Sequence, residues 1–189
     1  ASGRLGRLRS RSHTVRRVRR PLALACLATI VGADYVIRRR RPRWIVVGML
    51  DEPAHVATAG LILLNLPLRS QEWPSREWTA GYLAGSLLPD LDHVPLALRA
   101  VHPDPGDPRP VTHCLLAVAP MALWAARTGS ATAKGAAAGM LAHFVRDLGI
   151  GTGAPLLWPA TSRHVRVPYS LYAAGCLLLG RRATLVDGL

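Results

Sequence analysis

The stretch "SLLPDLDHVP" at residues 86–95 places two carboxylates and an imidazole side by side, at Asp90, Asp92 and His93. They follow an apolar segment, where charged groups are costly unless they are paired or bound to a metal. On an irregular helix end, one such carboxylate can bridge two cations while the other binds terminally or orients an imidazole. The stretch therefore predicts a metal site, and a helix cap or a salt bridge is the structural alternative.

A second pair of candidate ligands lies in "HFVRD", at residues 143–147. On an α-helix, residues four positions apart differ by roughly 40° in direction and about 6 Å in height. His143 and Asp147 can therefore bind one metal, or two adjacent ones. A structural ion pair uses the same spacing, so this pair alone does not decide between the two.

Two more histidines lie in other apolar segments, His55 after "DEPA" and His113 in "RPVTHCLL". Each alone is typical of a residue that packs between helices, but together the polar residues of an apolar chain indicate one shared centre. The predicted metal ligands are His55, Asp90, Asp92, His93, His113, His143 and Asp147. A histidine-rich set with carboxylate oxygens suits zinc, or else manganese or iron, rather than calcium.

The elements that must position these residues are predicted to be helices. The chain has one Phe and four Tyr and shows no sustained alternation of apolar and polar residues, so strand signals are poor. Small residues dominate, as in closely packed helices. Helices are predicted over residues 21–37, 43–50, 53–66, 76–88, 111–127, 131–147 and 167–181. "DEP" at 51–53 indicates a helix start with Pro53 at the first position, and Ser75 a helix cap.

The net charge of +13 is concentrated at the N-terminal end. Residues 1–43 contain thirteen arginines and one acid, Asp34, so the remaining residues are nearly neutral. Such an arm binds anionic lipid head groups or nucleic acid, or serves as a solubilising or targeting segment. The apolar body favours lipid. Nucleic acid is disfavoured because no aromatic residue lies among the arginines of residues 1–20 to stack on bases.

The apolar segments are short for membrane spans. The longest runs without a charged residue have about 13 to 17 residues, whereas a spanning helix needs about 20. We therefore expect an all-α bundle that is membrane-associated or multi-pass, with helices that span obliquely or only dip into the bilayer. The positive-inside tendency places the N-terminal arm in the cytoplasm. The predicted units are an arginine-rich arm with a short apolar segment at 1–43 and a helical metal-site domain at 44–189.

The order of these motifs resembles that of the membrane-bound metal-dependent hydrolases, described as LexA-regulated inner-membrane hydrolases. The matching elements are His55, "LPDLDH" at 88–93, "PRPVTHCLL" at 108–116, "HFVRD" at 143–147 and "GTGAPLLWP" at 151–159. The resemblance covers roughly residues 48–170. It departs from the family pattern at Pro108, where the family has a histidine, and at Cys114, where it has a serine. Arg109, Thr112 and His113 are kept.

The resemblance implies an all-helical hydrolase of the inner membrane, with a site similar to those of helical zinc-dependent phospholipases and nucleases. We expect hydrolysis of a phosphoester or lipid-like substrate by metal-activated water. Asp92 or Asp147 would accept or orient the proton, and Arg109 or Arg146 would neutralise a phosphate oxygen. A serine nucleophile is not indicated, because the residues around Ser86 read "AGSLL" rather than G-x-S-x-G.

Two other functions remain open on the sequence. In the first, the chain is a non-catalytic helical membrane protein, or a degenerate hydrolase, whose His and Asp residues hold helices together. In the second, it is a basic subunit that contacts nucleic acid through residues 1–43. Metal content separates the first from the hydrolase, and salt-dependent binding tests the second.

Overall fold

The computed structural model describes residues 2–66, 73–93 and 112–185, except for the side chains of residues 2–17, Trp44 and Asp92. Most of the described residues are helical, and they include one isolated β-bridge between Ala154 and Val165 but no strand, so the predicted all-α fold is confirmed. The α-helices are α1 (Ser2–Arg40), α2 (Trp44–Leu64), α3 (Arg76–Gly85), α5 (Ala119–Thr128), α6 (Ala131–Gly149) and α7 (Tyr169–Leu185). Two 3-10 helices are η1 (Leu88–Asp92) and η2 (Leu115–Val118).

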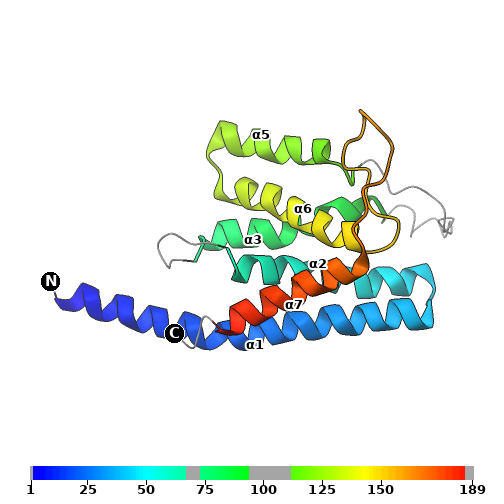
Figure 1. The fold of residues 1–189 in the computed structure, drawn as a ribbon. Helices are drawn as coiled ribbons and strands as arrows, with labels where there is room; N and C mark the ends of the chain where they lie inside the picture. Colours follow the sequence, from blue (N-terminus) through cyan, green and yellow to red (C-terminus); the bar gives the residue numbers. More distant parts are fainter. Residues whose placement is uncertain (1, 67–72, 94–111, 186–189) are drawn as a thin grey trace.

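Helices α1, α2 and α7 form one side of the bundle (Figure 1). α1 and α2 are an antiparallel hairpin, in which Arg41 makes the turn with a positive φ of 45°. α7 packs against both, and residues such as Ala23, Leu61 and Cys176 form their shared core. This side of the molecule thus joins the N-terminal and C-terminal helices around α2.

Helices α3 and α6 are interlocked through glycines. A Cβ atom on Gly139 would lie 2.0 Å from the carbonyl oxygen of Tyr82, and one on Gly85 would lie 2.2 Å from that of Ala136. Small residues at this spacing let two helix backbones approach closely. The contact positions the candidate site, because His143 lies one turn beyond Gly139 and η1 follows α3 directly.

The structure corrects several predicted helix boundaries. Segments 43–50 and 53–66 are a single helix, α2, with Pro53 inside it rather than at its start. Proline lacks the N–H that would bond the carbonyl four residues back, a loss that packing against neighbouring helices can offset, and α2 packs on both α1 and α6. Asp51 therefore lies on the same helix as His55, one turn earlier.

The other boundaries change at prolines. α3 ends at Gly85 instead of residue 88, and η1 begins at Leu88 with Pro89 as its second residue. The helix predicted over 111–127 begins only at Ala119, with a proline in its first turn, where a missing N–H leaves no intrahelical bond unmade. The cap at Ser75 is confirmed, because the backbone N–H of Trp78 donates to its hydroxyl across 3.2 Å.

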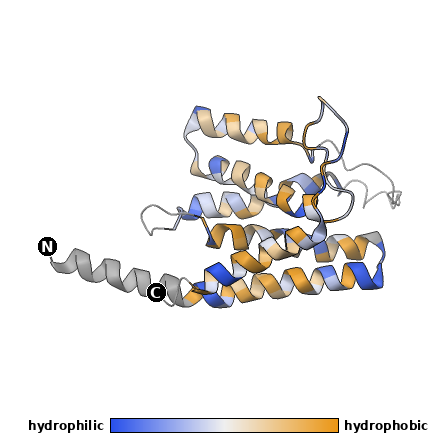
Figure 2. Cartoon of the chain, in the orientation of Figure 1, coloured by the Kyte–Doolittle hydropathy of each residue, from blue (hydrophilic) through white to orange (hydrophobic). Residues whose placement is uncertain are grey.

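Two helices are long and apolar enough to cross a membrane, Val18–Arg40 and Ile45–Leu64. The expectation that the apolar segments are too short to span was wrong, because it ended each segment at a charged residue. The helices continue through Asp34, Asp51 and Glu52. Much of their apolar surface is on the outside of the bundle (Figure 2). On α7, Leu178 is also exposed. Exposed apolar surface of this extent is typical of contact with lipid or with another protein.

Candidate metal centre

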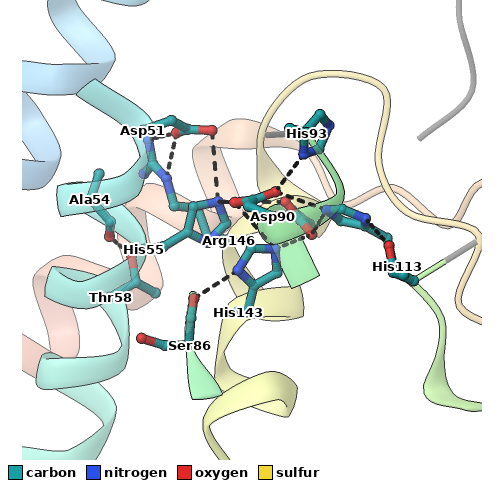
Figure 3. A network of polar contacts seen from close by, with 12 residues as sticks. Asp51, Ala54, His55, Thr58, Ser86, Asp90, His93, His113, His143 and Arg146 are labelled. Atoms are coloured by element: carbon teal, nitrogen blue, oxygen red, sulfur yellow. Dashed lines mark hydrogen bonds and ion pairs between the residues drawn. The ribbon is translucent and has the colours of Figure 1, made fainter. Parts of the chain in front are cut away.

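Imidazoles and carboxylates from separate helical segments meet in one buried cluster (Figure 3). α2 contributes His55, η1 contributes Asp90, and the segment before η2 contributes His113. α6 contributes both His143 and Asp147, which share one face because they are four positions apart. His55, His113, His143 and Asp147 are each at most 1% exposed.

Asp90 lies between the histidines. Its Oδ1 is 3.0 Å from His113 Nε2 and 3.3 Å from Nδ1 of His93, the residue after η1. Its Oδ2 is 3.7 Å from both His55 Nε2 and His143 Nε2. Burial alone would raise the pKa of Asp90, but the hydrogen bonds with His113 and His93 outweigh it and hold the pKa well below its usual range. Asp90 is therefore a carboxylate whose two oxygens face different histidine pairs.

Asp147 closes the other side of the cluster. Its Oδ2 is 3.0 Å from His143 Nε2 and 3.8 Å from His113 Nε2, and its Oδ1 is 3.7 Å from His55 Nε2. Burial would lower the pKa of His143, but the hydrogen bond and negative charge of Asp147 outweigh it and raise the pKa above its usual value. The same ring nitrogen thus attracts a proton strongly, and by the same electrostatics a metal cation.

The backbone fixes the orientation of His143. Its Nδ1–H donates to the carbonyl oxygen of Ser86 across 2.8 Å, which leaves Nε2 to face the carboxylates. Metal-binding histidines usually donate their other ring N–H in this way. The ring also stacks on that of His55, with ring centroids 3.9 Å apart and planes 9° apart.

The spacing and chemistry of these atoms fit a divalent metal. Three overlapping groups have ligand atoms within 4.8 Å of one another: His55, Asp90 and His143; Asp90, His93 and His113; and His113, His143 and Asp147. Two ligands at about 2.1 Å from a tetrahedral zinc ion lie about 3.4 Å apart. The nitrogen–oxygen distances of 3.0 to 3.8 Å within the cluster span that value. Because the groups share members, the arrangement suits one ion or two adjacent ones.

The structure brings six of the predicted ligands together: His55, Asp90, His93, His113, His143 and Asp147. Asp92 is the last residue of η1, but its side chain is not among those described, and Arg109 lies in the segment 94–111, outside the described residues. Their catalytic roles, and the ligand role of Asp92, remain predictions.

A network around Arg146 adjoins the cluster and was not predicted. Arg146 is 0% exposed. Its Nε and Nη2 donate to Asp51 Oδ1, Nη2 also donates to Asp34 Oδ1 across 2.8 Å, and Nη1 donates to the Tyr172 hydroxyl across 2.9 Å. Burial alone would lower the pKa of Arg146. The negative charges of Asp51 and Asp34 outweigh this effect and raise the pKa above its usual value. Four hydrogen bonds engage all three guanidinium nitrogens inside the bundle, which argues against the expectation that Arg146 neutralises a substrate phosphate.

A signal for this network was present in the sequence. Asp34 is the one acid within the arginine-rich residues 1–43, and Asp51 is four positions before His55. The spacing of Asp51 and His55 on one helix could not be recognised while a helix was expected to begin at Pro53. Within the described part of the centre, the carboxylates of Asp34, Asp51, Asp90 and Asp147 surround one guanidinium and several imidazoles. The excess of negative charge favours a bound cation.

Comparison with known proteins gave one match. The profile of a family described as YdjM inner membrane protein matches residues 49–185. The match includes α2 from Met49 onward and all the elements that form the cluster. No curated protein and no solved structure matched the chain.

Proposed function

The chain belongs to the YdjM inner membrane protein family and is a membrane protein; on this premise, we propose that it is a metal-dependent hydrolase. The proposed substrate is a phosphoester or another lipid-like ester at the membrane. The proposed cofactor is a divalent metal, with zinc preferred over manganese or iron because of the imidazole and carboxylate donors.

The observation that carries this proposal is the convergence of His55, His113 and His143 with Asp90 and Asp147 inside an apolar helical bundle. Ionisable groups within a membrane protein are costly, and they are retained mainly where they pair, bind ions or take part in chemistry. Helix packing alone would be served by one or two hydrogen bonds. It would not require several ring nitrogens and carboxylate oxygens directed at a common space.

A divalent ion bound here would acidify water and polarise the ester oxygen of a substrate. The protein would hold the ion through the histidines and through Asp90, whose two oxygens allow it to serve two neighbouring ions. His93 is 37% exposed, so it marks the side from which substrate would enter. Asp92, which precedes His93, and Asp147 are the candidates for accepting the proton, and Arg109 is the candidate for binding the phosphate.

The membrane setting supports a lipid-like substrate. Two helices are long and apolar enough to span a bilayer, and α2, the second of them, also contributes His55. The centre is therefore built partly on a candidate membrane helix. We further propose that the N-terminal arm lies in the cytoplasm, because eight arginines precede the first apolar segment.

Metal analysis of the full-length protein in detergent tests the proposal. We expect zinc, manganese or iron to copurify in stoichiometric amount, and chelation to abolish hydrolysis of a chromogenic phosphoester that added metal restores. His143→Gln should lose both metal and activity. Absence of metal, together with an Asp90→Asn variant that behaves as the wild type, would favour the non-catalytic role in which these residues only pack helices.

A further inference from the structure

We propose that Asp51 is an additional metal ligand on the His55 side of the centre, and that Arg146 holds it in position. Nothing in the sequence motifs assigned a role to this residue. The inference rests on the proposed function, because it requires that the centre bind metal. It adds a ligand from the N-terminal half of α2, one turn before His55.

The two oxygens of Asp51 face different partners. Oδ1 accepts from Nε of Arg146 across 2.8 Å and also from Nη2. Oδ2 points away from the guanidinium and lies 3.7 Å from His55 Nε2 (Figure 3). A carboxylate with one oxygen bonded to a neighbouring donor and the other on a metal is the usual arrangement for a supported ligand.

The surroundings of His55 Nε2 indicate a cation rather than direct hydrogen bonds. Asp51 Oδ2, Asp90 Oδ2 and Asp147 Oδ1 are each 3.7 Å from this nitrogen. That distance is longer than an N–H···O hydrogen bond, which rarely exceeds about 3.2 Å. Oxygens from three segments therefore lie near the ring nitrogen at a distance close to the roughly 3.4 Å expected between two ligands of one ion.

The charges of the Arg146 network lead to the same assignment. Arg146 carries one positive charge and pairs with both Asp34 and Asp51. One of the two carboxylate charges is therefore left without compensation by the guanidinium. Asp34 also accepts from the Tyr169 hydroxyl across 3.0 Å, whereas the second oxygen of Asp51 faces His55. A cation beside His55 would neutralise the charge that Arg146 leaves over.

Asp34 provides a matched control. Like Asp51 it bonds Arg146, and it is 2% exposed, but it lies on α1 and accepts its hydrogen bonds from Arg146 and Tyr169. Replacing either acid by asparagine keeps the size of the side chain and an oxygen that can accept from Arg146. Both variants therefore remove one negative charge from the partners of Arg146, and they differ in whether they remove an oxygen from the metal side.

The experiment uses the full chain in detergent, stripped of metal and titrated with Co²⁺, whose visible absorption reports the ligand set, and with Zn²⁺ in competition with a chelating dye. Asp51→Asn should weaken binding by about tenfold or more and shift the cobalt band. Asp34→Asn removes the same charge but no oxygen from the metal side, so it should weaken binding less and leave the cobalt band unchanged. Asp51→Glu keeps the charge facing Arg146 but displaces the second oxygen, so it should fold and still shift the band.

Wild-type binding and spectrum in Asp51→Asn would overturn the proposal. It would also fail if Asp34→Asn and Asp51→Asn weakened binding equally, because Asp51 would then act only through Arg146. If Asp51→Asn does not fold, an unchanged cobalt spectrum in Asp51→Glu overturns it instead. A wild-type protein that binds no metal would overturn the proposed function itself, an outcome distinct from the others.

Discussion

His143 Nδ1 and the carbonyl oxygen of Ser86 lie 2.8 Å apart and join the middle of the bundle to the metal centre. Ser86 is the C-cap residue that follows α3, and His143 lies on α6. Because the acceptor belongs to the backbone, the orientation of the imidazole depends on how the two helices pack. The direction in which Nε2 of His143 faces is thus set by the fold rather than by a neighbouring side chain.

Replacement of Asp90 by asparagine should remove most of the metal. Asp90 contacts His113 and His93 through one oxygen and faces His55 and His143 through the other, so its loss affects every part of the centre. We expect metal affinity to fall by about 100-fold, the upper end of the loss seen when even a supporting group is removed. Elemental analysis after dialysis measures this.

The control for this prediction is Glu77→Gln. Glu77 is an exposed acid in the first turn of α3, remote in sequence from the cluster. The Glu77→Gln substitution should leave the metal content unchanged. Equal metal content in the wild type and Asp90→Asn would show that Asp90 is not a ligand.

Gly139→Ala should destabilise the protein although alanine is the better helix former. The new Cβ would lie 2.0 Å from the carbonyl oxygen of Tyr82, so α3 and α6 would have to separate. Such overpacking typically costs about 1–3 kcal/mol, and thermal unfolding in detergent measures it. Gly175→Ala is the matched control, because a Cβ there meets nothing within 4 Å. Equal melting temperatures for the two variants would contradict the close packing.

Metal affinity should decrease as the pH falls. His143 faces Asp147 on its own helix, Asp90 of η1, and the rings of His55 and His113. The carboxylates raise its pKa above the ordinary value, so in the metal-free protein the imidazole holds its proton to a higher pH than usual. Metal must displace that proton, at a cost of about tenfold in affinity for each pH unit below the pKa.

The same shift has the opposite effect on the stability of the metal-free protein. Because the pKa of His143 is raised on folding, protonation stabilises the fold below the unfolded pKa, and this contribution is lost as the pH rises through the folded pKa. Zinc titrations and melting curves at pH 6, 7 and 8 measure both effects. Affinity that does not change with pH would contradict the prediction, and the melting temperature of metal-free His143→Gln should depend less on pH than that of the wild type.

Arg146→Gln should be strongly destabilising. It would leave the carboxylates of Asp34 and Asp51 without their guanidinium inside the bundle, a change that typically costs about 3–5 kcal/mol. Arg146→Lys should recover only part of this, because an ammonium cannot reproduce the donors directed at Asp34, Asp51 and Tyr172. A melting temperature equal to the wild type in either variant would show that the network contributes little.

The N-terminal arm should be found in the cytoplasm. A fluorescent protein that folds only in the cytoplasm should be active when fused before residue 1, and a disulfide-dependent periplasmic reporter should not. Replacing the eight arginines of residues 1–20 by glutamine should weaken this preference, while Arg181→Gln with Arg182→Gln near the C-terminus serves as the control. Activity of the periplasmic reporter alone would contradict the proposed orientation.

The sequence was sufficient to predict the fold class and that six of the seven candidate ligands lie close together, whereas their role as metal ligands stays a prediction. Small residues and poor strand signals indicated packed helices, and the spacing of His143 and Asp147 on one helix face predicted that both reach the centre. These features depend on local periodicity, which is visible along a chain. The division into an arm at 1–43 and a domain at 44–189 stays a prediction, and α1 packs on α2 and α7 in the structure.

The Arg146 network could not be predicted in the same way. Its partners Asp34, Asp51 and Tyr172 come from three other helices, and only the tertiary packing brings them to one guanidinium. Pro53 added to the difficulty, because proline usually marks a helix start and here lies within α2. Other helix ends were misplaced for the same reason. Local sequence signals do not show at which helix-breaking residues tertiary packing lets the helix continue.

The close glycine contacts between α3 and α6 also fix how far His143 lies from the candidate ligands on other segments. Sliding α6 along α3 by a single residue would displace His143 by about 1.5 Å, whereas metal–ligand bonds tolerate errors of only about 0.2 Å. Gly135 and Gly139 lie against the carbonyl oxygens of Trp78 and Tyr82, so α3 and α6 can pack this closely at only one register. The distances between the candidate ligands thus depend on glycines, which have no side chain of their own.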